Sequence, residues 1–155
     1  RRYSPLEREV QDEKCNELLS AGFIVPCPIT QYASCPTMPA KKDADGNWTD
    51  RRFCLDFRTV NGHTKADRYG LPLPEDLFAR AAGARFFSHI DLRSGYMQIP
   101  VHPRDQPKTA FHWGNATYMF TRMPFGLKNA AAKFQRVMDA EIAAAGLQAN
   151  AAPFQ

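Results

Sequence analysis

The sequence predicts an α+β domain in which antiparallel hairpins pack with about three helices. Two patterns carry this prediction. Apolar residues recur at helical spacing in stretches that begin with capping residues, and short apolar runs elsewhere are separated by turn residues. The 155 residues, 44% hydrophobic and 23% charged, suit one compact domain or a piece of a larger protein.

The first helix is expected within residues 4–22. Ser4 is a good N-cap, Pro5 favours the first helical position, and Glu7 is placed for a capping box. Gly22 supplies the stop. The apolar residues at roughly helical spacing are Leu6, Val10, Leu18 and Leu19.

A hairpin is expected to follow an extended stretch. Residues 26–40 contain four prolines, which restrict them to extended chain and edge strands. Asp45-Gly46 is a hairpin signal, and residues 52–57 read as the returning strand. A short helix is then predicted within residues 71–83, which begin with prolines and acids and end on Gly83.

Residues 86–101, FFSHIDLRSGYMQIPV, predict one strand up to Asp91, a turn, and a second strand through Val101. A further hairpin is expected around Gly114-Asn115, and a helix after Asn129, a possible N-cap. Residues 146–155 give no clear signal. The apolar face expected to be core on the last helix is Phe134, Val137, Met138 and Ile142.

Composition excludes several classes. The four cysteines form no Cys-x-x-Cys pair, so neither a structural zinc site nor a secreted disulfide scaffold is expected. There is no signal peptide and no apolar run near the length of a membrane span, which predicts an intracellular protein with reduced thiols and no membrane partner. The chain begins Arg-Arg without Met, so we expect an excerpt or a processed piece.

The net charge of +4 indicates an anionic partner only weakly. Between residues 104 and 136 lie six Lys or Arg and one acid, Asp105. This distribution fits a track for a nucleic-acid backbone and fits a solvated surface about equally well. The candidate nucleic-acid contacts are Lys108, Lys128, Lys133 and Arg136.

Asp91 raises the main functional question, because an apolar strand-like run ends there on a carboxylate. Aspartate commonly opens a turn by bonding its own backbone. It can also hold a hard metal ion, which prefers carboxylate oxygens on a rigid support such as a strand end.

Four stretches in fixed order decide between these readings: residues 51–61, 69–77, 86–101 and 121–139. Together with residues 108–113, KTAFHW, they resemble the fingers and the first half of the palm of a reverse transcriptase. The resemblance is strongest to gypsy-class long-terminal-repeat retrotransposon polyproteins. The resemblance implies a partial right-hand polymerase fold. It implies leader and fingers at 1–85, palm with an inserted fingers hairpin at 86–145, and an unassigned tail at 146–155.

The resemblance also implies RNA-directed DNA polymerase chemistry, in which two divalent cations, Mg²⁺ or Mn²⁺, assist an in-line displacement at phosphorus. Asp91 would be the catalytic, metal-binding aspartate, and the backbone carbonyl of Leu92 would touch the metal. Tyr96 would lie under the sugar and exclude a 2′-hydroxyl, although a tyrosine here also suits a turn or a core.

The remaining nucleotide contacts implied by the resemblance come from the fingers and from a palm loop. Arg52 and Lys41 would clamp the triphosphate, with Lys42 adjacent to Lys41 as a competing choice. Phe125 and Gly126 would lie beside the nucleotide. The implied partners are an RNA or DNA template with its primer, deoxynucleoside triphosphates, and the rest of the polyprotein: the remaining palm, the thumb and RNase H.

Two departures from the family pattern stand out. Ala131 stands where the family usually has proline. The family's second catalytic element, a Tyr-x-Asp-Asp box, is absent, since the sequence contains no Asp-Asp pair. We therefore expect a truncated polymerase that is inactive alone, with an open strand edge where the palm hairpin would pair. The alternative is a non-catalytic nucleic-acid-binding or decayed retroelement remnant.

Overall fold

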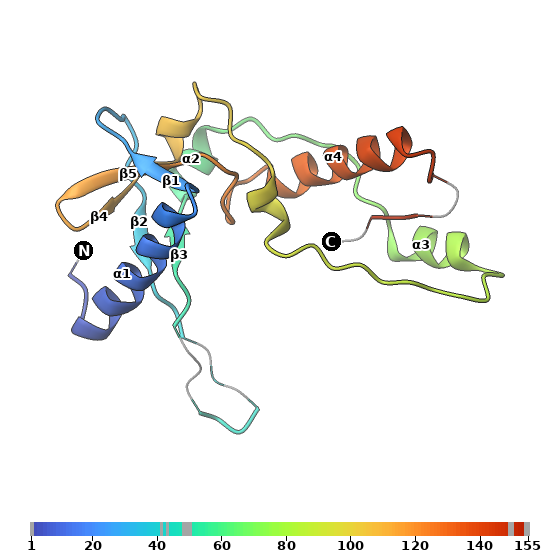
Figure 1. Ribbon diagram of the computed structural model, residues 1–155, viewed down its shortest axis with the longest axis horizontal. Coiled ribbons are helices and arrows are strands. Elements are labelled where there is room, and N and C mark those ends of the chain that lie inside the picture. Colours follow the sequence, from blue (N-terminus) through green and yellow to red (C-terminus); the bar gives the residue numbers. More distant parts are fainter. Residues whose placement is uncertain (1, 41, 43, 48–50, 149–150, 154–155) are drawn as a thin grey trace.

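The computed structural model describes residues 2–40, 42, 44–47, 51–148 and 151–153. Within these residues the chain forms helices and small antiparallel sheets, so its fold is α+β as predicted (Figure 1). Lys41, a predicted site residue, lies outside the described residues. No helix in the described part of the chain is both long enough and apolar enough to cross a membrane.

Helix α1 (Pro5–Ser20) begins with the predicted capping box. The Glu7 amide donates to Ser4 Oγ at 3.3 Å, and the Ser4 amide donates to a Glu7 carboxylate oxygen at 2.9 Å. The buried face differs in part from the predicted one. Gln11, Cys15 and Leu18 are buried, whereas Leu6 and Leu19 are exposed. Burial of Gln11 is compensated by its side-chain amide, which donates to the His112 carbonyl.

A three-stranded sheet in the order β1-β5-β4 packs against α1. Its strands are β1 (Ile24–Pro26), β4 (Phe111–Trp113) and β5 (Ala116–Phe120). The predicted hairpin around Gly114-Asn115 is confirmed, since β4 and β5 pair antiparallel with Phe111 opposite Tyr118. The first core lies between α1 and this sheet and comprises Cys15, Leu18, Ile24, Phe111 and Phe120.

The predicted second hairpin is also present. Strands β2 (Cys35–Thr37) and β3 (Cys54–Asp56) pair antiparallel, with Cys35 opposite Asp56. A bridge between Ser34 and Phe111 connects this two-stranded ribbon to the first sheet. The ribbon is therefore fixed to the first core and presents Asp56 beside the start of the next helix.

The remaining helices are α2 (Arg58–His63), α3 (Pro74–Ala81) and α4 (Ala130–Ala144), with short 3-10 helices η1 (Gly95–Gln98) and η2 (Gln106–Thr109). Helix α3 confirms the helix predicted within 71–83. A second core between η1 and α4 is built from Ile99, Met123 and Ala130, with Tyr96, Val101, Leu127, Phe134 and Val137 packed against it.

The predicted strand from residue 86 to Asp91 is wrong, and the second strand through Val101 is reduced to a bridge between Pro100 and Arg122. Ser94 adopts a left-handed conformation (φ 50°, ψ 47°), and η1 follows it. The apolar pattern of a strand is present at 86–91, but the described residues provide no neighbouring strand for it. A strand exists only where a partner satisfies its backbone.

Candidate functional site

The turn that follows Asp91 is tightly constrained. Asp91 is exposed, and Ser94 takes the left-handed conformation that side chains rarely adopt. The Ser94 carbonyl accepts a hydrogen bond from the Met97 amide at 2.8 Å, which closes η1. A non-glycine residue at positive φ persists only where surrounding structure enforces it, and such positions concentrate at functional sites.

Packing on Gly95 enforces the turn. A Cβ added to Gly95 would lie 2.9 Å from Phe134 Cε2 and 3.8 Å from Leu92 Cβ. Any larger residue at position 95 would have to displace the ring of Phe134, on α4, which rests directly on the backbone of the turn. Sequence reasoning missed this contact, since the two residues are far apart in the chain.

Three aromatic rings meet beside this turn. The Tyr96 ring centroid lies 5.1 Å from that of Phe125 and 5.4 Å from that of Phe134. Tyr96 and Phe125, two sequence-predicted site residues, are thus brought together from η1 and from the loop before α4. Tyr96 is half-buried and Phe125 is 55% exposed, so the cluster presents an aromatic surface to solvent.

The loop that carries Phe125 is held by the β3–α2 segment. Gly126 has φ 92°, a conformation that favours glycine, and a Cβ there would lie 3.5 Å from Phe57 Cδ2. Asn61 on α2 donates through Nδ2 to the Gly126 carbonyl and accepts from the Lys128 amide, each at 2.8 Å. Asn61 ends the motif at 51–61, which was the available sequence signal, but its contact with this loop was not predicted.

Arg52 lies two residues before β3 and is exposed. Its backbone amide donates to the Pro39 carbonyl at 3.0 Å. The same stretch of chain then reaches the Gly126 loop, because the Leu55 carbonyl and the Phe57 ring approach Gly126. No hydrogen bond or ion pair between described residues joins the Arg52 side chain to Asp91.

The oxygen atoms at Asp91 are of the type that binds a divalent cation, but they are too few to hold one. A carboxylate and the neighbouring Leu92 carbonyl are oxygen ligands of the type that Mg²⁺ prefers. Among the described residues, however, no three His, Cys, Asp or Glu side chains gather closely enough to hold a metal. Asp139, a later aspartate, lies on α4 and accepts a hydrogen bond from Tyr69.

The predicted nucleic-acid contacts differ in how they are engaged. Lys108 Nζ lies 2.6 Å from an Asp105 carboxylate oxygen, and Lys128 Nζ donates to the Thr64 carbonyl at 3.0 Å. Lys133 is exposed on α4. Of these three, Lys133 is the most available to a phosphate, because the other two side chains already have polar partners within the chain.

Arg136 belongs to a polar seam between α4 and residues 65–69. Its guanidinium forms an ion pair with Asp67 at 2.8 Å and lies over the Tyr69 ring, 4.7 Å from the centroid. The Tyr69 hydroxyl donates to Asp139 at 2.9 Å, which raises the pKa of Tyr69 above its usual range. Arg136 therefore has a structural role that the sequence did not indicate.

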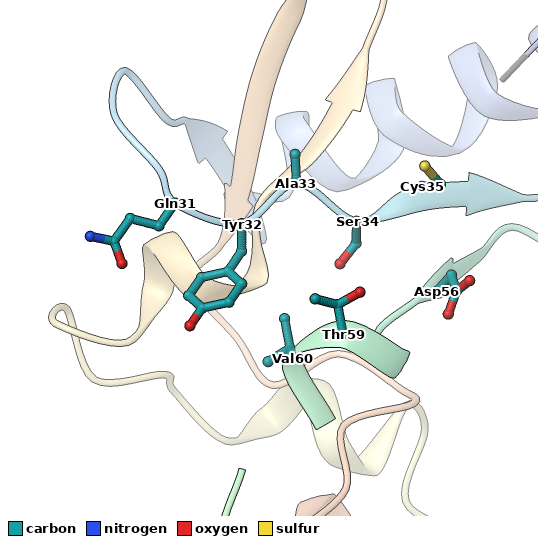
Figure 2. A pocket seen from close by; sticks show the side chains of 8 residues that line it. All are labelled: Gln31, Tyr32, Ala33, Ser34, Cys35, Asp56, Thr59 and Val60. Carbon is teal, nitrogen blue, oxygen red and sulfur yellow. The ribbon is translucent and has the colours of Figure 1, made fainter. Parts of the chain in front are cut away.

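A pocket of about 180 Å³ lies between the entry to β2 and helix α2 (Figure 2). The Tyr32 ring stands at one end, Asp56 at the other, and Ser34, Thr59 and Val60 lie between them. Arg58 binds Asp56 at 2.6 Å and, together with its backbone amide, lowers the pKa of that carboxyl to about 2. This pocket was not predicted, and none of the residues that line it belongs to the Tyr96 cluster.

A family model described as "Reverse transcriptase (RNA-dependent DNA polymerase)" matches residues 40–147. The chain belongs to this family. The reverse transcriptase match covers the aromatic cluster, the Asp91 turn, the Gly126 loop and Arg52. It confirms the family that the four ordered sequence stretches predicted.

Relatives place this reverse transcriptase among retroelement polyproteins, as predicted. The chain is 39% identical over 130 residues to a retrovirus-related Pol polyprotein from transposon gypsy of Drosophila melanogaster, covering 83% of this chain and 12% of that protein. It is 33% identical over 138 residues to the enzymatic polyprotein of Cauliflower mosaic virus (strain NY8153), covering 89% and 20% respectively. The chain is thus similar to a small part of each, within the reverse transcriptase domain.

Solved reverse transcriptases share the fold. The chain resembles the native prototype foamy virus protease-reverse transcriptase with a TM-score of 0.74 and 22% identity, covering 92% of this chain and 18% of that one. It resembles the foamy viral protease-reverse transcriptase dRH in complex with ds DNA with a TM-score of 0.73, also at 22% identity, covering 92% and 25%. The partial right-hand polymerase fold predicted from the sequence is therefore confirmed.

Proposed function

We propose that these residues form the nucleotide-side part of an RNA-directed DNA polymerase site, which adds deoxynucleotides to a primer when the rest of the polymerase is present. The observation that carries the proposal is the contact between Tyr96 and Phe125 at the turn that follows Asp91. Their ring centroids lie 5.1 Å apart. A partly exposed aromatic surface next to a carboxylate suits a sugar and base whose triphosphate approaches a metal.

Asp91 is the catalytic, metal-binding aspartate in this proposal, assisted by the Leu92 carbonyl. Divalent cations, Mg²⁺ or Mn²⁺, would activate the primer hydroxyl and steady the leaving pyrophosphate when bound. Because one carboxylate is too few for two cations, the other ligands would come from a part of the polymerase that these residues do not include. We therefore expect no primer extension by the 155-residue chain alone.

Arg52 and Lys41 would bind the triphosphate, since a guanidinium holds two phosphate oxygens and an ammonium acts as a point charge. Support comes from the position of Arg52 just before β3, whose continuation packs on Gly126. Tyr96 would exclude a 2′-hydroxyl, and Gly126 would allow the backbone to approach the nucleotide. The proposed partners are a primer with its RNA or DNA template, deoxynucleotides and the rest of an intracellular polyprotein.

The test uses a polymerase that contains these 155 residues, assayed for primer extension with magnesium. Asp91→Asn should abolish extension, whereas Asp105→Asn, which changes an exposed aspartate paired with Lys108, should preserve it. Tyr96→Ala should increase ribonucleotide incorporation relative to deoxynucleotides. Full activity of Asp91→Asn, or magnesium-dependent extension by the isolated chain, would show that the proposal is wrong.

A non-catalytic nucleic-acid-binding remnant is the alternative, favoured because no three His, Cys, Asp or Glu side chains among the described residues gather closely enough to hold a metal ion. Binding of the chain to a primer–template duplex should then weaken with salt. Lys133→Ala should make the negative slope of log K against log salt shallower by roughly 0.9. Lack of any salt-dependent binding would favour a decayed remnant.

A further inference from the structure

The pairing between β2 and β3 continues beyond the two strands, toward Arg52. The strands end with Thr37 opposite Cys54, and two residues further along the Arg52 amide donates to the Pro39 carbonyl at 3.0 Å. Proline has no amide hydrogen, so Pro39 cannot return the second hydrogen bond that such a pair of residues normally exchanges. The pair formed by Pro39 and Arg52 therefore has one backbone bond where an ordinary pair has two.

The side chain of Arg51 adds a bond at the same level of the ribbon. Its Nη1 donates to the Met38 carbonyl at 2.9 Å, one residue before the carbonyl that holds the Arg52 amide. A guanidinium carries five N–H donors in a fixed fork, so it can serve one acceptor firmly and still face a second. Arg51 thus braces the position in the chain from which Arg52 extends.

The same guanidinium faces the start of helix α1. Arg51 Nη1 lies 3.8 Å from Glu7 Oε1, while the other carboxylate oxygen of Glu7 accepts from the Ser4 amide in the capping box. The capping box therefore fixes the carboxylate to which Arg51 is attracted. Because the Glu7 side chain is only 17% exposed, water screens this attraction less than it would on an open surface.

A second contact attaches the N-terminal segment to the ribbon. The Tyr3 hydroxyl donates to the Pro36 carbonyl, on β2, at 3.0 Å. Both Tyr3 and Glu7 precede the residues that match the reverse transcriptase family model, which begin at residue 40. The ribbon that carries Arg52 is therefore supported in part by residues outside the matched region.

We propose that Arg51 is a positioning residue for Arg52, because it fixes the end of the ribbon to helix α1 and so sets where the triphosphate-binding guanidinium stands. This inference rests on the proposed function of Arg52. Arg51 does not bind the nucleotide itself, since its guanidinium is engaged by the Met38 carbonyl and the Glu7 carboxylate. A group that is held in place before its ligand arrives loses less freedom on binding, so the brace increases affinity for the deoxynucleotide.

Kinetics of a polymerase that contains these residues give the first test. Arg51→Ala removes both contacts and should raise the KM for deoxynucleotide roughly fivefold, with kcat changed by less than about twofold, because binding and not chemistry is weakened. Arg51→Lys keeps a positive charge facing Glu7 and should recover part of the loss. Lys14→Ala is the matched control, since it removes a cation paired with Glu17 within α1, and it should leave this KM unchanged.

Glu7→Gln tests the contact from the side of the helix. Glutamine can replace glutamate in a capping box, so the start of α1 is kept while the charge that faces Arg51 is lost. The KM for deoxynucleotide should rise, but by less than in Arg51→Ala, because the bond to the Met38 carbonyl remains. The KM for the primer–template should not change in either variant. An equal rise in both KM values would indicate general damage and overturn the proposal.

Hydrogen exchange on the same polymerase tests the brace without substrate. The Arg52 amide should exchange faster in Arg51→Ala than in the wild type, because its bond to the Pro39 carbonyl should open more often once the brace is lost. Lys14→Ala should leave this amide unaffected. Unchanged exchange at Arg52 in Arg51→Ala would overturn the proposal, whatever the kinetics show.

A double-mutant cycle separates this inference from the proposed function on which it rests. Arg52→Ala should raise the KM for deoxynucleotide, and Arg51→Ala added to it should have no further effect, because Arg51 acts through Arg52. Additive effects, or a normal KM in Arg51→Ala while Arg52→Ala raises it, would overturn the inference alone. A normal KM in Arg52→Ala would overturn the triphosphate role of Arg52, and the inference with it.

Discussion

Among the glycines, Gly95 is the one at which an added Cβ would meet the nearest neighbouring atom. A Cβ there would meet Phe134 Cε2 at 2.9 Å, inside a cluster that also contains Tyr96. We expect Gly95→Ala to lower the free energy of unfolding by about 1–3 kcal/mol, the usual cost of overpacking a core. Urea unfolding followed by circular dichroism measures this change.

Gly70→Ala is the control for this prediction. Gly70 does not have positive φ, and a Cβ there would have nothing within 4 Å. Its free energy of unfolding should stay unchanged or rise slightly, because alanine restricts the unfolded chain. Equal destabilisation by the two substitutions would mean that the contact with Phe134 is not the cause.

The pKa of the Asp56 carboxyl should depend on its contact with Arg58. Hydrogen bonds from the Arg58 side chain and then from its backbone amide lower the pKa of Asp56 to about 2. Because the folded pKa lies below the unfolded one, the contact stabilises the fold above the ordinary carboxyl pKa, and this stabilisation is lost as pH falls through about 2. Arg58→Gln should raise the pKa of Asp56, as measured by NMR of its carboxyl carbon. The pKa should stay below that of an ordinary aspartate, because the backbone amide of residue 58 still donates to the carboxylate.

Residue-level prediction from sequence succeeded where the signal is local and failed where it is not. The turn after Asp91 was located correctly, because Ser94-Gly95 is a turn signal in itself. The need for glycine at 95 depends on Phe134, and the engagement of Arg136 depends on Asp67, so neither could be inferred from neighbouring residues. The roles of Arg52, Tyr96 and Phe125 rest on family resemblance and stay predictions.

At the level of elements, α2 holds the loop before α4 through one side chain. Asn61 bonds both the Gly126 carbonyl and the Lys128 amide. Asn61→Ala should remove both bonds, cost about 1–2 kcal/mol, and speed hydrogen exchange of the Lys128 amide. Asn61→Asp keeps the acceptor for that amide but loses the donor to Gly126, so it should retain protection at Lys128.

Asn16→Ala, an exposed change on α1, is the control and should leave this amide unaffected. Unchanged exchange at Lys128 in Asn61→Ala would contradict the clamp. A loss of protection in Asn61→Asp as large as in Asn61→Ala would show instead that the bond to the Gly126 carbonyl is the essential one.

Helices and hairpins with local start and stop signals were predictable, and the others were not. The capping box of α1 and the β4–β5 turn are encoded within a few residues. Asn129 was expected to cap α4 and does stand at its N-cap, but its side chain bonds residues 65 and 67 instead of the helix. The strand expected at 86–91 failed because pairing requires a second segment, which no local pattern supplies.

At the level of the whole molecule, η1 connects the two cores. Met97 packs against the first core, which contains Cys15 and Phe111. The adjacent Tyr96 packs against the second core. A disturbance of the second core should therefore be felt in the first, as expected for a small domain that unfolds cooperatively.

Thiol labelling can measure this coupling. Cys35 and Cys54 are exposed and should react quickly, whereas Cys15 is fully buried in the first core, and burial raises its pKa to about 12. Because the thiolate is the reactive form, Cys15 should be labelled only when the first core opens. Gly95→Ala acts in the second core, so faster labelling of Cys15 in this variant, with no change in Gly70→Ala, would demonstrate the coupling. An unchanged rate at Cys15 in a variant whose second core is destabilised would show that the cores open separately, and that η1 does not transmit strain between them.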